Sequence, residues 1–567
     1  MHRLFIISAL FIALLIELSL LLLSFTSAQA TTITVCNIGC DYATIQSAVN
    51  VSSPGDTILV ASGRYTDNVT VTVTLNIRGA GALSTTIDGN MAGSVITVEP
   101  NTVVTITGFT ITNGRGIAVD GEARGGGIYN WGVLTIISST IKDNTARGAD
   151  GVNVGEAGRY AYGGGIYNAC LENSCGQLTL INSIVSGNTA TGGHGADGDA
   201  DHPAGDGGRA YGGGVCNRCS ASNCGAVMLT STLVVGNYTV GGDGGGSSGN
   251  NSGNGGHSYG GGIYNDGTGN VGGLITMTLG SVMNNYAHGG NTGKMLLGSP
   301  GIGQGGGSYN SGVMTLIAST VGQNSATSGS VGFPYYYGSS PGGGIYNSGQ
   351  LTLIGSTVYN NDSNYGGGLY NGSGSFAELV NSTISGNSAY YTGGGIDHSG
   401  TMTLTNTTIS RNRAGDGGFR VSGHRGGGIN SNGLIYLRNT IIAENDVWDF
   451  YGPRGFDCFG TLTSQGHNLV QNASDCNIIG DTTGNIISRT AFLLPLQDNG
   501  GPTPTHALWF VSPAIDAGDP AYCPATDQRG MPRPTDGDSD GLAVCDIGAY
   551  EGYMPPVSRS YLPVILR

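Results

Sequence analysis

Apolar and polar residues alternate in short segments along most of this chain, as in Leu351-Thr352-Leu353-Ile354 and Thr401-Met402-Thr403-Leu404. Thr, Ile, Val and Tyr dominate these segments, and Gly, Asn and Ser bound them, which is typical of short β-strands. No stretch of this region shows the sustained period of ~3.6 residues that marks an amphipathic helix. The pattern therefore predicts an all-β chain built from many short strands.

A six-residue motif, Gly-Gly-Gly-Ile-Tyr-Asn, recurs between these strands. Each copy leads into a block of the type Leu-Thr-Leu-x-x-Ser-Thr-Ile-x-x-Asn, as in Leu351 to Asn361. The tightest copies are 24 and 27 residues apart, which suits one turn of a β-solenoid better than a helix pair of ~34 residues. Copies or near-copies of the motif start at Gly125, Gly163, Gly212, Gly260, Gly305, Gly342, Gly366, Gly393 and Gly426.

Matching positions of successive coils should stack about 4.8 Å apart and form ladders along the axis. We expect Asn amides to hydrogen bond along the ladders and the glycines to allow sharp turns. One predicted Asn ladder comprises Asn130, Asn168, Asn217, Asn265, Asn310, Asn347 and Asn371. A second comprises Asn144, Asn188, Asn237, Asn285, Asn324, Asn361, Asn387, Asn412 and Asn445. A tyrosine ladder, interrupted by Cys216, comprises Tyr129, Tyr167, Tyr264, Tyr309, Tyr346 and Tyr370.

The start of the predicted solenoid contains a short amphipathic helix, Tyr42 to Val51, with Ile45, Ala48 and Val49 on one face. This segment, together with Gly63-x-Tyr65 and Ile87-Asp88-Gly89, resembles the N-terminal part of the pectin-lyase-like proteins. The resemblance implies an all-β fold, a right-handed parallel β-helix (β-solenoid) with an N-terminal helical cap. A cap is also expected physically, because an open end would expose core and strand edges. We assign residues 31–100 to the cap and first coils.

Residues 101–445 form the predicted repeat body, which resembles bacterial surface proteins with the same repeats, a class that includes the polymorphic outer-membrane proteins. Its long Gly-rich insertions all follow the second Asn ladder. Insertions at one register should emerge on one face, which is often the binding face. They are Arg147 to Tyr162, Thr191 to Tyr211, Thr239 to Tyr259, His288 to Gln304 and Thr327 to Pro341. A shorter insertion site follows the Tyr-Asn pair.

Composition and charge narrow the class of partner. The net charge is −15, and Lys142 and Lys294 are the only lysines, so no basic patch exists and nucleic acid is excluded as an expected partner. The average field would repel a polyanionic glycan unless cations bridged the two. The 104 glycines lack a strict three-residue period over the chain, which excludes collagen.

The N-terminus predicts export. His2 and Arg3 precede an apolar run from Leu4 to Leu23, and Ala28-Gln29-Ala30 fits a cleavage site, so residues 1–30 are interpreted as a signal peptide. An uncleaved membrane anchor is the alternative, because the run is long for a signal peptide. We expect no membrane span in the mature form.

Eleven cysteines fit an oxidising compartment. Alignment of the repeats places Cys219 and Cys224 where Cys170 and Cys175 lie, which leaves Cys216 as the odd thiol. A metal site formed by Cys216, Cys219 and Cys224 is the alternative. The other expected local pairs are Cys36 with Cys40, Cys458 with Cys476, and Cys523 with Cys545.

The repeats fade near Asp446, and residues 446–552 resemble the choice-of-anchor Q domain. The resemblance rests on Leu496 to Leu508, Ser512 to Gly518, Asp527 to Gly530 and Cys545 to Glu551. It implies a small C-terminal anchor-type domain and a bacterial cell-surface or secreted destination. Residues 553–567 form a tail too short to span a bilayer, without a common anchor motif.

The run from Asp536 to Gly541 carries carboxylates at alternate positions with a glycine, the arrangement that Ca²⁺ prefers. The twelfth-position Glu of a calcium loop is missing; Ile547 stands there, one residue after Asp546. Asp536, Asp538, Asp540 and Asp546 are therefore the candidate ligands of a structural Ca²⁺.

Four tyrosines precede glycine triplets: Tyr162, Tyr211, Tyr259 and Tyr365. Exposed rings at solenoid spacing could stack on sugar rings, which makes these residues the candidate glycan-binding site. Ordinary packing at the edge of the coils is the alternative role.

Catalytic signatures are incomplete. Ile396-Asp397-His398 is similar to part of a pectate lyase segment, but it lies at the Tyr-Asn ladder position and the partner Arg-x-Pro-x-x-Arg segment is absent. Ser422-Gly423-His424 is similar to part of the polygalacturonase Gly-His-Gly, without the matching Asn-Thr-Asp. We therefore assign no catalytic residue.

The sequence favours a secreted or surface-displayed β-helix that binds an extracellular polysaccharide or cell-surface glycan, or acts as a spacer or adhesin. A polysaccharide lyase or glycoside hydrolase is the alternative, and self-association is a further expectation.

Overall fold

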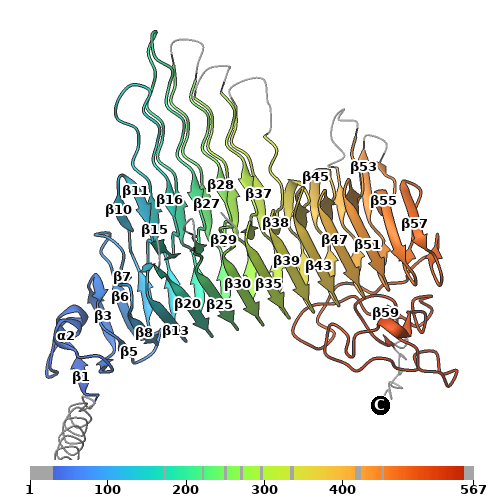
Figure 1. Cartoon of the computed structure of the whole chain (residues 1–567), viewed down its shortest axis with the longest axis horizontal. Coiled ribbons are helices and arrows are strands. Elements are labelled where there is room, and N and C mark those ends of the chain that lie inside the picture. The colour runs from blue at the N-terminus through green and yellow to red at the C-terminus, as the bar shows by residue number, and fades with distance from the viewer. Residues whose placement is uncertain are drawn as a thin grey trace, which may run out of the picture.

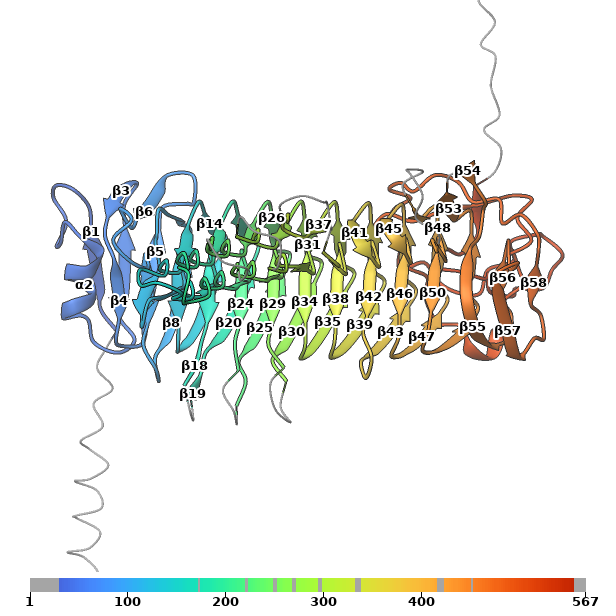
Figure 2. The ribbon, with the colours of Figure 1, turned by 90° about the horizontal axis from the view of Figure 1, so that it is seen from above.

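The computed structural model describes residues 30–171, 174–219, 223–247, 252–267, 272–293, 298–331, 338–415, 423–449 and 452–554. All but one residue of the predicted signal peptide and most of the predicted tail lie outside these ranges. The described chain winds into an elongated stack of coils, in which strands pair in parallel with the equivalent strands of the next coil (Figures 1 and 2). The predicted all-β, parallel β-helix fold is confirmed.

Each coil runs through sheet A twice, then sheet B, then sheet D. The first passage through sheet A contains the Ile-Tyr-Asn segments: β4 (Val69–Val71), β7 (Ile96–Val98), β12 (Ile128–Asn130), β17 (Ile166–Asn168), β24 (Val215–Asn217), β29 (Ile263–Asn265), β34 (Ser308–Asn310), β38 (Ile345–Asn347), β42 (Leu369–Asn371), β46 (Ile396–His398) and β50 (Ile429–Ser431).

The second passage contains the Leu-Thr-Leu segments: β1 (Thr32–Val35), β2 (Thr57–Val60), β5 (Leu75–Gly79), β8 (Val103–Thr107), β13 (Val133–Ile137), β20 (Gln177–Ile181), β25 (Ala226–Thr230), β30 (Leu274–Thr278), β35 (Val313–Ile317), β39 (Gln350–Ile354), β43 (Phe376–Val380), β47 (Thr401–Thr405), β51 (Leu434–Arg438), β55 (Cys458–Gln465) and β57 (Cys476–Asp481).

Sheet B contains the Ser-Thr-Ile segments: β3 (Gly63–Thr66), β6 (Thr85–Asp88), β9 (Thr110–Thr112), β14 (Thr140–Lys142), β21 (Ile184–Ser186), β26 (Leu233–Val235), β31 (Ser281–Met283), β36 (Thr320–Gly322), β40 (Thr357–Tyr359), β44 (Thr383–Ser385), β48 (Thr408–Ser410), β52 (Ile441–Ala443), β56 (Leu469–Val470) and β58 (Ile486–Ile487).

Sheet D follows the second Asn ladder: β15 (Thr145–Arg147), β22 (Thr189–Thr191), β27 (Tyr238–Val240), β32 (Tyr286–His288), β37 (Ser325–Thr327), β41 (Asp362–Tyr365), β45 (Ser388–Thr392), β49 (Arg413–Ala414), β53 (Asp446–Asp449) and β54 (Gly452–Pro453). Sheet C lies just before the glycine triplets: β10 (Ile117–Val119), β11 (Glu122–Arg124), β16 (Ala161–Tyr162), β23 (Ala210–Tyr211), β28 (Ser258–Tyr259) and β33 (Gly303–Gln304).

The core lies inside the coils and repeats with them. One coil buries Ile345, Leu351, Leu353 and Val358 completely, and its neighbours bury the equivalent residues. Burial of each such side chain contributes about 1.5–3 kcal/mol. Because each coil packs on its neighbours, the core is a continuous column rather than a sphere.

The glycine triplets make the turn that the sequence predicts. The first glycine of all nine motifs has a positive φ of 59–73°, a conformation that favours glycine. The second glycine lies against the next coil: a Cβ on Gly126 would be 2.1 Å from the carbonyl oxygen of Gly164. Both requirements explain why the triplet recurs in every coil.

The predicted Asn ladders are confirmed. In the first ladder each Nδ2 donates to the next Oδ1 at 2.7–2.9 Å, and His398 follows Asn371 at its end. In the second the same bonds measure 2.8–3.0 Å, and Asp457 accepts from the last amide, Asn445. Burial raises the pKa of Asp457 to about 7.

The N-terminal cap is helix α2 (Ile45–Val51), somewhat shorter than predicted. The hydroxyl of Thr44 accepts a hydrogen bond from the Ser47 amide and begins the helix. Ile45, Ala48 and Val49 are buried, as predicted, and join the same hydrophobic core as the coils. The helix therefore covers the open end of the column.

The long insertions project from one face of the β-helix, as predicted (Figure 1). They pack as extended segments rather than as strands. The amides of Gly192, Gly195 and Gly198 donate to carbonyls of the next insertion, while Gly193 and Ala196 donate to the preceding one. A repeat of three residues is typical of polyproline II geometry. We call this bundle, the described parts of residues 148–160, 192–209, 241–257 and 289–302, the glycine-rich projection.

The coils continue beyond Asp446, where the sequence repeats fade. Strands β55 to β58 still pair with the strands before them. After Ile487 the chain folds back along sheet B, below the coils in Figure 1, and contains β59 (Leu508–Trp509), the short helix η1 (Pro520–Tyr522) and β60 (Tyr553–Met554). Gln528, for example, exchanges hydrogen bonds with Thr357 and Thr383.

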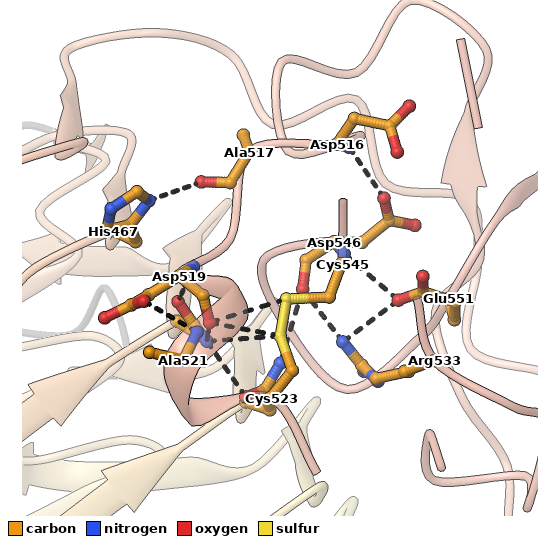
Figure 3. Close-up of a disulfide and its surroundings, with 12 residues drawn as sticks. His467, Asp516, Ala517, Asp519, Ala521, Cys523, Arg533, Cys545, Asp546 and Glu551 are labelled. Atoms are coloured by element: carbon orange, nitrogen blue, oxygen red, sulfur yellow. Dashed lines mark hydrogen bonds and ion pairs between the residues drawn. A yellow bond between two sulfur atoms is a disulfide. The ribbon is translucent and has the colours of Figure 1, made fainter. Parts of the chain in front are cut away.

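A network of buried charged side chains lies inside this C-terminal region (Figure 3). Arg533 forms an ion pair with Glu551 at 3.2 Å, and both side chains are almost fully buried. Asp546 accepts hydrogen bonds from the amides of Asp516 and Gly552, and burial raises its pKa to about 8. The neighbouring Cys523–Cys545 disulfide links two loops of the region.

The five predicted disulfides all form, including Cys219–Cys224, and Cys216 is a buried free thiol. The disulfide removes the alternative metal site at Cys216, Cys219 and Cys224. In the part of the chain that the structure describes, no helix has the length and apolar character needed to cross a membrane.

Candidate functional site: a pocket between two ladders

Two parallel rows of side chains lie beside each other on the outside of the coils. The inner row is the predicted tyrosine ladder, which continues in register from Tyr370 to Asp397, Asn430 and Phe459. The outer row consists of the residues just before the glycine triplets. In order these are Arg124, Tyr162, Tyr211, Tyr259, Gln304, Pro341, Tyr365, Thr392 and Arg425.

In the N-terminal coils the two rows fill the space between them. The rings of Tyr162, Tyr211 and Tyr259 are stacked, with 4.9 Å between the centres of successive rings. The ring of Tyr162 also contacts that of Tyr167 in the inner row. Tyr162 and Tyr211 are 4% and 8% exposed, and Tyr259 is half-buried. Their faces therefore contact protein rather than solvent. These three tyrosines were predicted either to bind glycan or to pack at the edge of the coils, and the contacts that they make are those of packing.

Burial shapes the electrostatics of this aromatic cluster. The guanidinium of Arg218 lies 4.8 Å from the Tyr162 ring centre and forms an ion pair with Asp266 at 3.1 Å. Desolvation raises the pKa of Tyr211 and of Tyr259 to about 12, so both phenols stay neutral at physiological pH. The two phenols are therefore neutral packing groups, and the charge of Arg218 beside them is paired with Asp266.

Further along the coils a pocket opens between the same two rows. Gln304 and Pro341 occupy the outer row where earlier coils have tyrosines, and these side chains fill less of the gap. The pocket has a volume of about 570 Å³. Its lining residues are Ile302, Gln304, Ser339, Pro341, Tyr346, Tyr365, Tyr370, Thr392, Asp397, Ser399, Gly423, Arg425, Asn430 and Asn432. Tyr365, the fourth predicted ligand residue, is among them.

One wall of the pocket is aromatic. Tyr346 and Tyr370 are stacked with ring centres 5.2 Å apart, and both are half-buried. Tyr365 comes from the outer row and stacks on Tyr391 at 5.0 Å, which fixes its ring. Rings held in this way offer apolar surface and hydroxyls at low entropic cost.

Asp397 is the one carboxylate among the lining residues that the structure describes. Its Oδ2 accepts hydrogen bonds from Thr392 and, at 3.1 Å, from the amide of Asn430. The residue is 5% exposed, and desolvation raises its pKa to about 6 despite these bonds. A carboxyl with this pKa can exchange a proton near neutral pH.

Arg425 supplies the pocket's positive charge. It directly precedes the triplet at Gly426, and its guanidinium lies 4.3 Å from the ring centre of Phe459. The side chain is exposed, and no ion pair to it occurs among the described residues. It can therefore bind an anionic or hydroxyl group of a ligand.

Neither Asp397 nor Arg425 is among the site residues that the sequence predicts. Asp397 follows Tyr370 at the register where most coils carry tyrosine, and this departure from the repeat is a sequence signal for it. Arg425 follows Thr392 in the more variable outer row, where the signal is weaker. His398, in contrast, belongs to the Asn ladder: Nδ1 lies 3.1 Å from Asn371 and Nε2 lies 3.0 Å from the Leu434 carbonyl. Burial lowers its pKa, so His398 is a neutral structural residue.

The predicted calcium ligands are only partly brought together. Carboxylate oxygens of Asp536 and Asp538 lie within 4.8 Å of each other and of an oxygen of Asp516, which is not one of the predicted ligands. Asp540 instead accepts from the Leu542 amide, and Asp546 is buried in the charge network described above. Calcium binding stays a prediction.

No protein-family model matches the chain, and no curated protein matches it in sequence. The resemblance to the choice-of-anchor Q domain therefore stays a prediction. The chain is similar to pectate lyase Pel9A (12% identity, 93% of this chain and 97% of that one, TM-score 0.32). It is also similar to XylC in complex with xylose, at 9% identity over 92% of this chain and 98% of that one, with a TM-score of 0.40. A PL6 alginate lyase in complex with a trisaccharide is similar at 12% identity over 85% of this chain and 92% of that one, with a TM-score of 0.31. At these values the similarities say nothing about what this chain binds or catalyses.

Proposed function

We propose that this β-helix works outside the cytoplasm, where it binds an extracellular polysaccharide or cell-surface glycan in the pocket between the two ladders. The observation that carries the proposal is the juxtaposition of Tyr346, Tyr365 and Tyr370 with Asp397 and Arg425 in one open pocket. The five disulfides support the compartment, because such bonds persist in oxidising environments.

Glycans suit this lining chemically. Sugar rings have apolar C–H faces, which pack on tyrosine rings, and equatorial hydroxyls, which need hydrogen-bond partners. The amides of Gln304, Asn430 and Asn432 and the guanidinium of Arg425 offer such partners in the lining. A volume of about 570 Å³ lies within the usual range of small-molecule sites, ~300–1,000 Å³.

The test is binding of the purified protein to immobilised polysaccharides, both neutral and acidic, followed by affinity measurement with the one retained. Tyr365→Ala and Arg425→Ala should each weaken binding about tenfold, which is the effect of losing ~1.4 kcal/mol. Tyr238→Ala and Arg78→Ala are matched controls, because both residues are exposed and far from the pocket along the chain. Retention of no glycan would contradict the proposal and leave a spacer role.

A second candidate function is polysaccharide degradation, which the raised pKa of Asp397 favours. One carboxylate does not make the pair that glycoside hydrolases use. Elimination from an acidic sugar needs only one base: Asp397 would take the proton beside the sugar carboxylate that Arg425 neutralises, a carbon–carbon double bond would form as the C–O bond to the leaving sugar breaks, and water would protonate the departing oxygen. Depolymerisation of an acidic polysaccharide that Asp397→Asn abolishes would establish this function; an active Asp397→Asn variant would exclude this residue as the base.

A further inference from the structure

A second pocket lies on sheet A near the N-terminal end of the repeats. Its floor is formed by Val103 and Val133, the first residues of β8 and β13, which pair in register and are 51% and 38% exposed. Gln177, the next residue of the same row, extends the floor, and Trp131 and Asn101 border it. The volume is about 540 Å³.

Trp131 has no aromatic counterpart in the neighbouring coils. The residue that follows the Tyr-Asn pair is Ala169, then Arg218, then Asp266 in the next three coils. The indole contacts the Tyr129 ring at 4.5 Å, with the planes tilted by 55°, so its position is set by the end of the tyrosine ladder. A half-buried indole beside exposed valines forms a flat apolar surface.

Two disulfide-closed hairpins border the pocket. Cys170–Cys175 joins β18 (Cys170–Leu171) to β19 (Ser174–Cys175), and Cys219–Cys224 closes the equivalent hairpin of the next coil. Figure 2 shows β18 and β19 extending away from sheet A. Cross-linked walls lose little conformational entropy when a ligand binds, which favours affinity.

None of the described residues that line this pocket is ionisable, since its cysteines are in disulfides. Among these described residues a charged ligand would find no partner of opposite charge to offset its lost hydration. An uncharged ligand with an apolar face and many hydroxyls instead matches the indole, the valines and the side-chain amides of Asn101 and Gln177.

We propose that this pocket is a second carbohydrate site, which binds a neutral oligosaccharide with a sugar ring on Trp131. It is independent of the pocket at Asp397. The Val133 row runs in register through Gln177, Ala226, Leu274 and Val313 to Gln350, five coil steps away and in the coil of Tyr346. Five steps correspond to about 24 Å, so one extended glycan with a neutral stretch could span both pockets and gain avidity.

The experiment titrates the full-length protein with cellohexaose, xylohexaose and mannohexaose, and with hexagalacturonate as the charged comparison, by calorimetry and tryptophan fluorescence. At least one neutral hexasaccharide should bind, Trp131→Ala should weaken it tenfold or more, and Trp131→Phe should restore part of the affinity. Gln177→Leu, at an exposed position, should also weaken binding, because it removes the side-chain amide from the pocket. Trp448→Phe is the matched tryptophan control.

Failure of this site is distinguishable from failure of the pocket at Asp397. Trp131→Ala should leave unchanged the slower amide exchange that a glycan in the Asp397 pocket gives to residues 392–399 and 423–432, since Trp131 lines only the second pocket. Binding of no neutral hexasaccharide, or equal affinity in wild type and Trp131→Ala, would overturn the inference.

Discussion

At the level of single residues, Asp397 is an ionisable carboxyl group at a position of the ladder where most coils have a tyrosine. It replaces a neutral tyrosine of the ladder with a buried carboxyl whose pKa is raised from 3.8 to about 6. The folded state therefore favours the protonated form more than the unfolded state does. The stabilisation from this group is complete below pH ~3.8 and is lost as the pH rises through about 6.

The unfolding free energy of Asp397→Asn should accordingly rise relative to that of the wild type as the pH increases. Because one pKa unit corresponds to ~1.4 kcal/mol, the difference in unfolding free energy between variant and wild type should shift by on the order of 2 kcal/mol between pH 4 and 7. Chemical denaturation at both pH values measures it. A pH-independent difference would show that the carboxyl is not desolvated.

The amide ladders make a second prediction at this scale. The Oδ1 of Asn237 accepts from both the amide and the Nδ2 of Asn188, and all these groups are buried. Asn237→Ala leaves the backbone amide of Asn188 and one of its two Nδ2 hydrogens without an acceptor, while Nδ2 keeps its bond to the Ile141 carbonyl, and it should lower the unfolding free energy by about 3 kcal/mol. Gln350→Ala, at an exposed side chain of sheet A, should change it by less than ~0.5 kcal/mol. Equal effects in urea denaturation would contradict the ladder's energetic role.

Residue roles were predictable where they repeat. The Asn and Tyr ladders, the glycine turns and the local disulfides follow from spacing, because every coil imposes the same contacts on the same positions. The pocket at Asp397 arises from departures at Gln304, Pro341, Asp397 and Arg425, and a pattern built on the consensus passes over such positions. The exposure of a tyrosine ring could not be predicted from the repeat either, because Tyr162 and Tyr365 share one register but have different surroundings.

At the scale of elements, the glycine-rich projection depends on close backbone approach. A Cβ at Gly256 would lie 2.0 Å from the carbonyl oxygen of Gly208 in the preceding insertion. Gly256→Ala should therefore separate these segments and increase amide exchange in residues 192–209 by at least tenfold, while the coils remain folded. Gly93→Ala is the control, because its Cβ would meet nothing within 4 Å. Unchanged exchange in Gly256→Ala would refute the packing.

The sequence predicted where these insertions emerge but not how they pack. Their direction follows from the common register, whereas the hydrogen bonds that repeat every third residue depend on contacts between insertions of different coils. The same holds for the C-terminal segment. Gln528 and His506 form hydrogen bonds with side chains of sheet B, and the sequence carries no periodic pattern from which these contacts could be predicted.

At the scale of the whole molecule, the stacked coils predict an elongated particle. Sheet B alone contains 14 strands, which span about 60 Å at ~4.8 Å per strand. Small-angle scattering should show a rod-like body at least that long with a side projection. A compact spherical envelope would contradict the stack, and a length that doubles with concentration would demonstrate the predicted self-association.

The proposed glycan site in the pocket between the ladders can be tested by locating the bound glycan on the chain. Hydrogen–deuterium exchange with the retained glycan, in the Trp131→Ala background that removes the second proposed site, tests it most directly. We predict slower exchange in residues 339–346, 365–371, 392–399 and 423–432, and no change in the glycine-rich projection. Protection confined to the projection or to residues 491–554 would show that the glycan binds outside the pocket between the ladders.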